Sequence, residues 1–254
     1  MRPNQVKRKL AAGDAVHGVF VGQNSPALAE LFGYCGFDYI LIDAEHGALA
    51  PGDVEDMTRA VEAAGVTPLV RVPANDPRII LRYMDVGPQG IMIPWCQSAA
   101  EADAAVRATK YHPDGNRGLA GVRAARYGVG MALTEYVKAA NVETLVIAQI
   151  ETVAAVEALP EMLRVPGVDV FFIGPNDLSQ SLGYPARQDE PAVQKVIEST
   201  LTRIIDAGKV AGIMIRDAAG ARRYRERGVQ FISIGAGSII APSARAFLKE
   251  AMAV

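Results

Sequence analysis

The sequence predicts one (β/α)₈ barrel, an α/β fold, and three observations support this fold class. Eight short apolar runs rich in β-branched residues are typical of buried parallel strands. These runs alternate with segments whose apolar residues recur at helical spacing. The length of 254 residues matches the usual size of such a barrel. A doubly wound open sheet is the rival fold, but it normally carries a GxGxxG phosphate loop, which this sequence lacks.

Each predicted strand is a run of five to eight residues bounded by turn residues. The strands are expected at 15–22, 38–44, 67–72, 90–95, 144–150, 168–174, 211–215 and 230–236. Helices are expected at 26–36, 52–65, 76–87, 98–111, around Glu135, around Glu157, at 192–208 and 218–228, and at 243–253, where the last helix closes the chain. No change in composition and no Pro- or Ser-rich linker divides the sequence, so we expect one domain over residues 1–254.

Composition and charge argue against several classes of partner. The formal net charge of −2 gives no electrostatic reason to expect nucleic acid or an anionic membrane. Cys35 and Cys96 have no metal-ligand spacing and are expected to be reduced, buried thiols. The first residues lack the apolar segment of a signal peptide, and no apolar run approaches the roughly 18 residues of a membrane span. We therefore expect a cytoplasmic protein.

The stretch 146–179 carries the strongest chemical signal. Its two apolar runs, VIAQI and VDVFFIG, are followed by Glu151 and Asp177, and the segment between the runs has helical periodicity. A right-handed strand–helix–strand unit places both carboxylates at the same edge of the sheet. Hard divalent cations take such oxygen ligands and leave positions open for substrate. For either acid alone, capping of the next helix is the commoner role, but Gln149 and the Gly-Pro turn before Asp177 favour a site.

Two other strand ends carry groups suited to catalysis, because the active sites of barrels lie at the carboxyl ends of their strands. His46 follows the second strand, and Asp43 and Glu45 are near enough to orient its imidazole as a general base. Arg71 ends the third strand and would be costly to bury without an anion. Its partner is either Asp43 or Glu45, or a substrate oxyanion, and the sequence favours neither alternative.

A long glycine-rich loop, 111–128, lies between the fourth and fifth predicted strands and is expected to be a lid over the open face of the barrel. Its arginines either contact solvent and a neighbouring subunit or capture a second carboxylate of the substrate. We assign the second role to Arg123 and the first to Arg117 and Arg126.

Taken together, six spaced motifs resemble the HpcH/HpaI aldolases, which are metal-dependent class II aldolases of 2-oxo acids. The motifs are DAEHG (43–47), RVP (71–73), DVGPQGIMIP (85–94), YHPDGNRG with ARYG (111–128), QIET (149–152) and FIGPNDLSQSLG (172–183). They extend over nearly the whole chain. Pro88 and the WCQS segment after Pro94 differ from the best-known members, which leaves the aldehyde acceptor open.

The resemblance implies a role for each matched position. Glu151 and Asp177 would bind magnesium, manganese or cobalt, and Arg71 would stabilise the pyruvate enolate. His46, supported by Asp43, would act through water as the base on the aldol hydroxyl. The pocket for pyruvate would be lined by Gln149, Gly174, Pro175 and Asn176, and Asp85 would reach the active site of a neighbouring subunit. The resemblance also implies a homohexamer, a trimer of dimers that exchange C-terminal helices.

The sequence hypothesis is therefore reversible cleavage of a 4-hydroxy-2-oxo acid to pyruvate and an aldehyde by a carbon–carbon lyase. A Schiff-base aldolase would need a lysine at a strand end, and all seven lysines fall in predicted helices, at helix ends or near the N-terminus. An acyl-CoA lyase of the citrate-lyase type would need a basic docking surface, for which the loop 111–128 is the candidate. A barrel that only binds an oxo acid or serves in an assembly is the non-enzymatic alternative.

Overall fold

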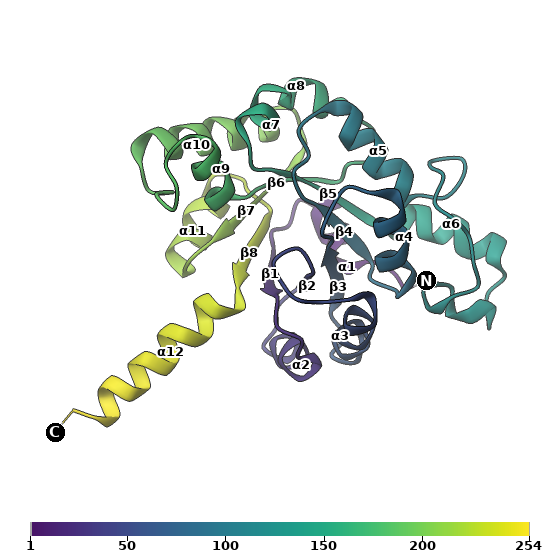
Figure 1. Cartoon of the computed structure of the whole chain (residues 1–254), viewed down its shortest axis with the longest axis horizontal. Helices are drawn as coiled ribbons and strands as arrows, with labels where there is room; N and C mark the ends of the chain where they lie inside the picture. Colours follow the sequence, from purple (N-terminus) through teal and green to yellow (C-terminus); the bar gives the residue numbers. More distant parts are fainter. Residues whose placement is uncertain (1, 254) are drawn as a thin grey trace.

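The computed structural model describes residues 2–253 and contains a closed barrel of eight parallel strands in sequence order (Figure 1). The strands are β1 Val16–Val21, β2 Tyr39–Asp43, β3 Thr67–Arg71, β4 Gly90–Ile93, β5 Leu145–Ile150, β6 Val170–Ile173, β7 Val210–Ile215 and β8 Phe231–Gly235. Each one lies at a predicted position. The predicted (β/α)₈ fold class is therefore confirmed.

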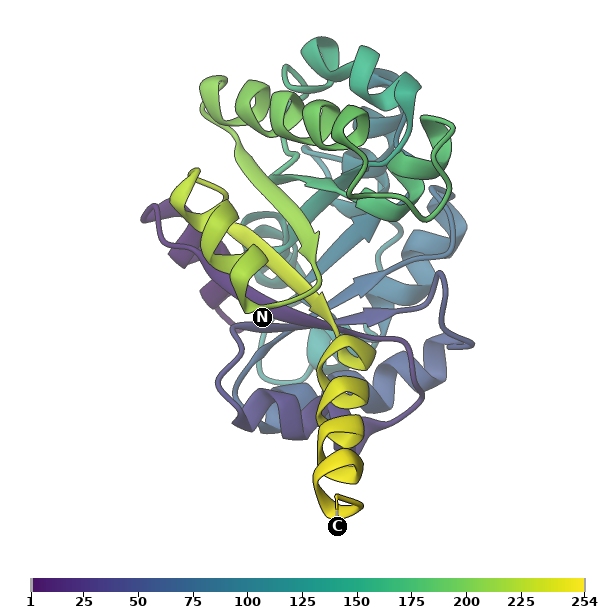
Figure 2. The same cartoon turned by 90° about the vertical axis from the view of Figure 1, so that its left-hand side faces the viewer.

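The helices that follow the strands pack around the barrel (Figures 1 and 2). They are α2 Pro26–Tyr34, α3 Pro51–Ala63, α4 Pro77–Asp85, α5 Ala99–Thr109, α6 Leu133–Glu143, α7 Val153–Glu157, α8 Leu159–Met162, α10 Pro191–Asp206 and α11 Ala218–Glu226. Side chains of Ser25, Asp76, Ser98, Thr152 and Asp217 accept hydrogen bonds from first-turn N–H groups, which fixes where five of these helices begin.

Two short helices were not predicted. Helix α1, Gln5–Ala11, lies under the amino ends of β4 and β5, where the Asn4 amide donates to the Gln89 carbonyl oxygen at 3.0 Å and Lys7 donates to the Thr144 carbonyl oxygen at 3.2 Å. Helix α9, Pro175–Ser181, begins directly after β6. Both have at most seven residues, which is too short to show a helical pattern in the sequence.

The barrel is filled by large side chains that point inward from the strands. The Tyr39 ring stacks on Phe231 at a centroid distance of 4.4 Å, and Phe20 lies 5.8 Å from Phe172. Gly18 makes room for this packing, because a Cβ atom there would lie 2.1 Å from the Tyr39 ring. The interior is thus a packed core, and one cavity lies at each of its two ends.

The parallel register brings the carboxyl ends of β2, β3, β5 and β6 to one end of the barrel. Asp43 pairs in register with Arg71, and Gln149 with Phe172. Because all strands run in the same direction, the residues that follow them collect around a single opening. This opening contains the candidate site.

The loop 111–128 lies at the other end of the barrel, so the prediction that it covers the open face of its own chain is wrong. It follows helix α5, which returns the chain to the amino ends of the strands, and it includes the 3₁₀ segment η1, Arg123–Gly128. Arg123 donates to the Val86 carbonyl oxygen, just after α4, at 2.7 Å.

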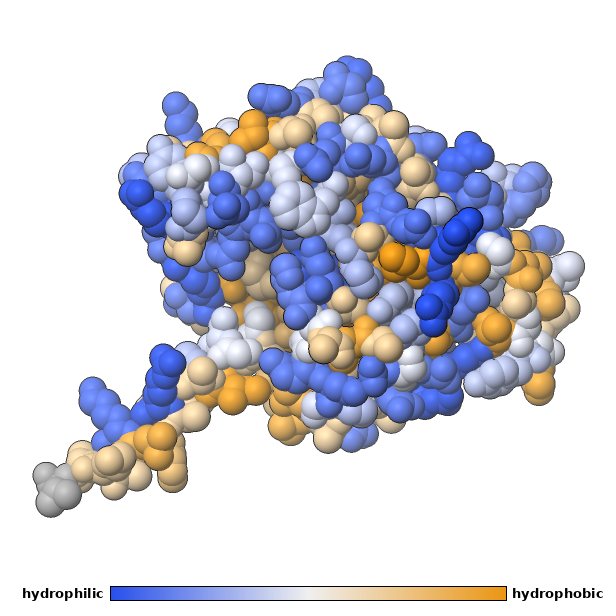
Figure 3. Space-filling view, viewed as in Figure 1, coloured by the Kyte–Doolittle hydropathy of each residue, from blue (hydrophilic) through white to orange (hydrophobic). Residues whose placement is uncertain are grey.

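The last helix, α12 (Ala236–Ala251), projects away from the barrel (Figures 1 and 2). It begins seven residues before the predicted start. The predicted helix began directly after Pro242, whereas this proline lies inside the observed helix. Its Ile240, Phe247 and Leu248 side chains are exposed, and apolar side chains coloured orange to tan lie along much of it in Figure 3. Within residues 2–253, no helix combines the length and the apolar character that crossing a membrane requires.

Candidate active site

A cavity of about 480 Å³ opens at the carboxyl ends of the strands. Most of the residues singled out from the sequence line it: Asp43, His46, Arg71, Gln149, Gly174, Pro175, Asn176 and Asp177. Glu151 lies behind this wall, where its carboxylate accepts a short hydrogen bond from the Gln149 side chain. The fold therefore gathers residues from four strand ends around one space.

Arg71 is buried and held by two carboxylates at once. Its Nε and Nη2 donate to the two carboxylate oxygens of Asp43 at 2.9 and 2.7 Å, and its Nη1 lies 2.9 Å from Oε2 of Glu45. The guanidinium also stacks over the Phe20 ring, 5.1 Å from its centroid. Burial acts to lower the pKa of Arg71, but the hydrogen bonds and negative charges of its neighbours outweigh burial and raise it. Arg71 is thus a fixed cation that also faces the cavity.

Glu151 is not a helix cap. The N-cap of α7 is Thr152, whose side chain accepts from the Ala155 N–H. Glu151 instead accepts a 2.7 Å hydrogen bond from the backbone N–H of Trp95, a residue with a left-handed backbone (φ 51°) at the end of β4. Burial raises the pKa of Glu151 to about 8, and the charges of neighbouring carboxylates add to this increase. The structure therefore holds Glu151 in place without stabilising its charged form.

Asp177 lies in the first turn of α9 and faces the same cavity. Its carboxylate accepts no hydrogen bond and pairs with no basic side chain in the part of the chain that the structure describes. Gly174 keeps open the space beside the Glu151 carboxyl group, because a Cβ atom at position 174 would lie 2.8 Å from Oε2 of Glu151. Only glycine allows β6 to approach Glu151 this closely.

Three carboxylates, those of Glu45, Glu151 and Asp177, are close enough to affect one another's charge. Burial raises the pKa of Glu45, and the negative charges of Asp43 and Asp177 raise it further. Oε2 of Glu45 is buried and has no hydrogen-bond partner among residues 2–253. Its contact with Arg71 is an ion pair whose geometry is too poor for a hydrogen bond. Excess negative charge of this kind is the environment that a divalent cation would compensate.

The donor set suits a cation that keeps open positions. No group of three or more His, Cys, Asp or Glu residues in the described chain has the arrangement of an all-protein metal cage. Glu151 and Asp177 offer oxygen donors from neighbouring strand ends, which is the small carboxylate set that magnesium-type ions use together with water and substrate. The chemistry of these two residues fits a divalent metal.

His46 is exposed at the mouth of the cavity. Asp43 accepts from the backbone N–H of His46 at 3.3 Å, not from its imidazole. Asp43 therefore shapes the turn that carries His46 and directly orients Arg71.

Asp85 and Arg123 lie outside this cavity. Asp85 ends α4 and pairs with Arg117 at 2.7 Å, and Arg123 pairs with Glu62 at 2.7 Å, both at the amino ends of the strands. Within one chain, neither residue reaches the space that contains Arg71.

Several lining residues were not found from the sequence. Phe20 and Met214 give the cavity an apolar wall, and the Trp95 N–H anchors Glu151. Each lies near a strand end, and this position was the only feature of the sequence that could have pointed to it. Apolar side chains and backbone N–H groups carry no chemical signature in a sequence. No lysine lines the cavity in the described chain, which agrees with the argument against a Schiff base.

The sequence of the chain is similar to those of known enzymes. The model of the HpcH/HpaI aldolase/citrate lyase family matches residues 17–242. The chain is 40% identical over 235 residues to 4-hydroxy-2-oxo-heptane-1,7-dioate aldolase of Escherichia coli, an alignment that covers 91% of this chain and 88% of that enzyme. It is 37% identical over 233 residues to hydroxypyruvate/pyruvate aldolase of Agrobacterium fabrum, covering 92% of this chain and 87% of the other.

Among solved structures, an HpcH/HpaI aldolase/citrate lyase family protein from Burkholderia cenocepacia superposes with a TM-score of 0.93 and 34% sequence identity, covering 98% of this chain and 100% of that one. The relatives named as aldolases are lyases, and each alignment covers more than nine-tenths of this chain. The chain therefore belongs to the HpcH/HpaI aldolase/citrate lyase family and is an aldolase.

Proposed function

We propose that the enzyme cleaves 4-hydroxy-2-oxo acids reversibly to pyruvate and an aldehyde, with a divalent metal ion held by Glu151 and Asp177. One observation carries this proposal: a fixed guanidinium and the Asp177 carboxylate line the same cavity at the carboxyl ends of the strands, and the Glu151 carboxyl group lies behind its wall, against Gln149. Aldol cleavage needs a site that accepts negative charge on a keto oxygen, and this arrangement supplies one.

A bound cation supplies positive charge that polarises the 2-keto group and stabilises negative charge on its oxygen. Arg71 adds a second positive group from the protein. Asp43 holds its Nε and Nη2 edge. Nη1 pairs with Glu45 at 2.9 Å without a hydrogen bond and donates weakly to Gln149 at 3.5 Å, so its N–H groups are the least firmly held and the best placed to turn to the substrate. Because two carboxylates fix the guanidinium before the substrate arrives, it does not need to reorganise during the reaction.

The proton balance requires a base at the mouth of the cavity. In the cleavage direction, the 4-hydroxyl loses a proton, the C3–C4 bond breaks, and its electrons move to the C2 oxygen as the enolate forms. His46 accepts this proton, directly or through a water molecule, and protonation of C3 then gives pyruvate. A general base of this kind contributes about 10² to 10⁴ in rate.

The alternatives are less well supported. A citrate-lyase-type reaction would need CoA to dock near the cavity, but the arginine-rich loop lies at the opposite end of the same chain. A barrel without catalytic function conflicts with its membership among aldolases at 37–40% identity.

We also propose that the enzyme is a homohexamer, in which each α12 packs on a neighbouring chain. This proposal is supported by the exposure of the apolar side chains of the projecting helix, of which Phe247 is 70% exposed. Within a single chain, only Ala236 at the start of α12 is buried.

The functional proposal is tested with Glu151→Gln and Asp177→Asn, which remove charge at nearly constant volume. Each is expected to lower kcat for pyruvate release by at least about 100-fold and to weaken binding of Mn²⁺, measured by its electron paramagnetic resonance signal. Asp189→Asn, an exposed carboxylate paired with Arg216, is the matched control and should retain both properties. Normal Mn²⁺ binding and turnover in both site variants would refute the assignment.

A further inference from the structure

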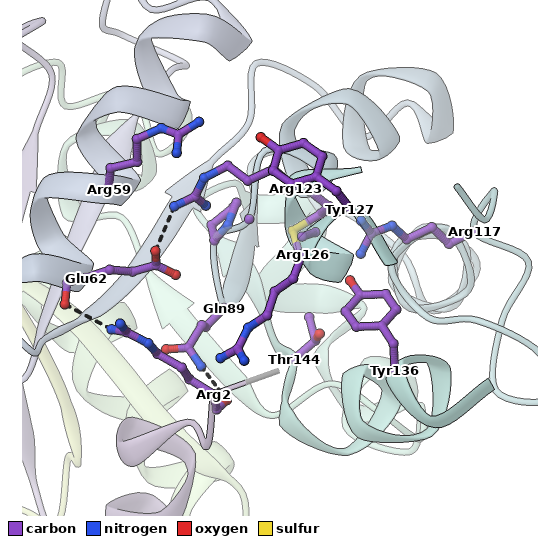
Figure 4. Close-up of a pocket in the computed structure, with 14 residues that line it drawn as sticks. Arg2, Arg59, Glu62, Gln89, Arg117, Arg123, Arg126, Tyr127, Tyr136 and Thr144 are labelled. Atoms are coloured by element: carbon purple, nitrogen blue, oxygen red, sulfur yellow. Dashed lines mark hydrogen bonds and ion pairs between the residues drawn. The ribbon is translucent and has the colours of Figure 1, made fainter. Parts of the chain in front are cut away.

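The turn between β4 and α5, residues 94–98, follows the carboxyl end of β4. It lies at the opposite end of this strand from Gln89, which lines the cavity at the amino ends of the strands (Figure 4). The turn includes the WCQS segment that differs from the best-known members of the family, and the proposed reaction gives its side chains no role. One main-chain group of the turn nevertheless contacts a proposed metal ligand, because the Trp95 N–H donates to Oε1 of Glu151 at 2.7 Å.

The ladder between β4 and β5 ends early, and this frees the N–H group of Trp95. The last residues paired across the two strands are Ile93 and Ala148, whereas β5 continues beyond this pair in register with β6. Pro94 has no N–H group that could extend the ladder, and Trp95 has a left-handed backbone with a φ of 51°. The N–H of Trp95 therefore turns from the ladder to the Glu151 side chain.

The residues around Trp95 hold its backbone in this conformation. Residues other than glycine seldom adopt a left-handed backbone, which persists where neighbouring contacts impose it and is common at functional sites. Cys96 is fully buried, and the Gln97 N–H donates to Oε2 of Glu101 at 2.7 Å at the start of α5. The Trp95 indole, in contrast, is 49% exposed. These contacts therefore fix the main chain of the turn more firmly than the Trp95 side chain.

Glu151 receives one hydrogen-bond donor on each of its carboxylate oxygens. Oε1 accepts from the Trp95 N–H, and Oε2 accepts the short hydrogen bond from the Gln149 side chain. An ionised carboxylate has about four lone-pair sites, so each oxygen keeps one site for a cation. Because the two donors come from different strand ends, they fix the plane of the carboxylate before an ion binds.

We propose that Trp95 is a positioning residue whose main-chain N–H holds Glu151 in the orientation that binds the divalent cation. The left-handed backbone is the feature that this role requires, and the indole is not required. Loss of a group that orients a metal ligand typically lowers metal affinity by about 10- to 100-fold. The inference rests on the proposed metal role of Glu151 and adds the main-chain group that prepares this ligand.

The test replaces a single N–H group by oxygen in the full-length enzyme, through incorporation of the α-hydroxy acid that corresponds to residue 95 or residue 97. The ester at position 95 keeps the indole but places an oxygen atom against Oε1 of Glu151, where the two oxygens repel each other. The ester at position 97 is the matched control, because the Gln97 N–H donates over the same 2.7 Å to a different carboxylate, that of Glu101. Trp95→Gly removes the indole, keeps the N–H and favours the left-handed backbone.

We expect the ester at position 95 to weaken Mn²⁺ binding about 10- to 100-fold. At saturating Mn²⁺ it should also change the electron paramagnetic resonance spectrum of the bound ion. The ester at position 97 and Trp95→Gly should bind Mn²⁺ within about threefold of the wild type and keep its spectrum, since both retain the donor to Glu151. Thermal melts separate positioning from folding, because each ester loses one main-chain hydrogen bond and the two should lower Tm by similar amounts.

Wild-type affinity and an unchanged spectrum in the ester at position 95 would overturn the positioning role. Equal losses of affinity in the two esters would also overturn it, as would a loss in Trp95→Gly as large as that in the ester at position 95. Glu151→Gln distinguishes these results from a failure of the proposed function. If Glu151→Gln binds Mn²⁺ as the wild type does, the metal assignment itself is wrong and the positioning role is wrong with it.

Discussion

Arg71 and Asp43 face each other across paired positions of β3 and β2 and form a two-pronged ion pair, with N–O distances of 2.9 and 2.7 Å. Both side chains are at least nine-tenths buried. The pair therefore has a structural role as well as a chemical one, and the two can be separated by mutation.

Arg71→Met removes the cation and leaves Asp43 and Glu45 buried without it. The free energy of unfolding should fall by roughly 3 to 5 kcal/mol, because a buried charge has lost its partner. The double variant Arg71→Met/Asp43→Asn should recover part of that loss but none of the activity. Urea denaturation and steady-state pyruvate release measure the two effects. A double variant that regained turnover would show that Arg71 acts only on stability.

Gly174→Ala tests whether space beside Glu151 is required. The added methyl group would lie 2.8 Å from Oε2 of Glu151 and 2.9 Å from Nε2 of Gln149, so both side chains must move. We expect metal affinity and kcat to fall by about 10- to 100-fold. Gly52→Ala, where a Cβ atom meets nothing within 4 Å, is the matched control and should leave both unchanged. Equal behaviour of the two variants would contradict the proposed close approach.

Lys110 predicts a pH dependence of stability. It is buried beneath the barrel, its Nζ donates to the Asn141 and Thr144 carbonyl oxygens at 2.7 and 2.6 Å, and burial lowers its pKa to about 8. Between pH 8 and 10.5 the unfolded chain keeps a proton that the folded enzyme has released, so this group makes unfolding less favourable as pH rises. Below pH 8 both states are protonated and the contribution is constant.

The measurement is the difference in free energy of unfolding between the wild type and Lys110→Met as a function of pH. It should be flat near pH 7 and rise by about 1 kcal/mol per pH unit above pH 8. The corresponding difference for Lys195→Met, which alters an exposed lysine, should stay flat throughout. A flat profile for Lys110→Met would mean that its amino group keeps an ordinary pKa.

The assembly proposal predicts that Phe247→Asp converts the hexamer to smaller species, because a charge would replace an apolar contact between chains. Light scattering coupled to size-exclusion chromatography gives the mass directly. Lys249→Glu on the same helix changes the charge without removing an apolar group and should leave the mass unchanged. A wild-type mass equal to that of one chain would refute the proposal.

The positions of the strands could be predicted because buried parallel strands appear in the sequence as continuous apolar runs. The residues at the carboxyl ends of the strands could then be identified as those that follow each run. The location of the loop 111–128 was misjudged for a definite reason: its lid role was inferred from length and glycine content, whereas its position is set by the direction of α5. The sequence left open whether Arg71 has a protein carboxylate or a substrate oxyanion as its partner; in the structure it pairs with both Asp43 and Glu45, because one guanidinium has enough donors for both. The hydrogen bond from the Trp95 N–H to Glu151 could not be predicted, because it depends on a left-handed backbone that no residue pattern indicates.

The most direct test of the account measures pyruvate release from a 4-hydroxy-2-oxo acid by enzyme from which metal has been exhaustively chelated. The account predicts that turnover disappears with the metal and returns when Mg²⁺, Mn²⁺ or Co²⁺ is added to the wild type, but not to Glu151→Gln. Full turnover by the chelated, metal-free enzyme would contradict it.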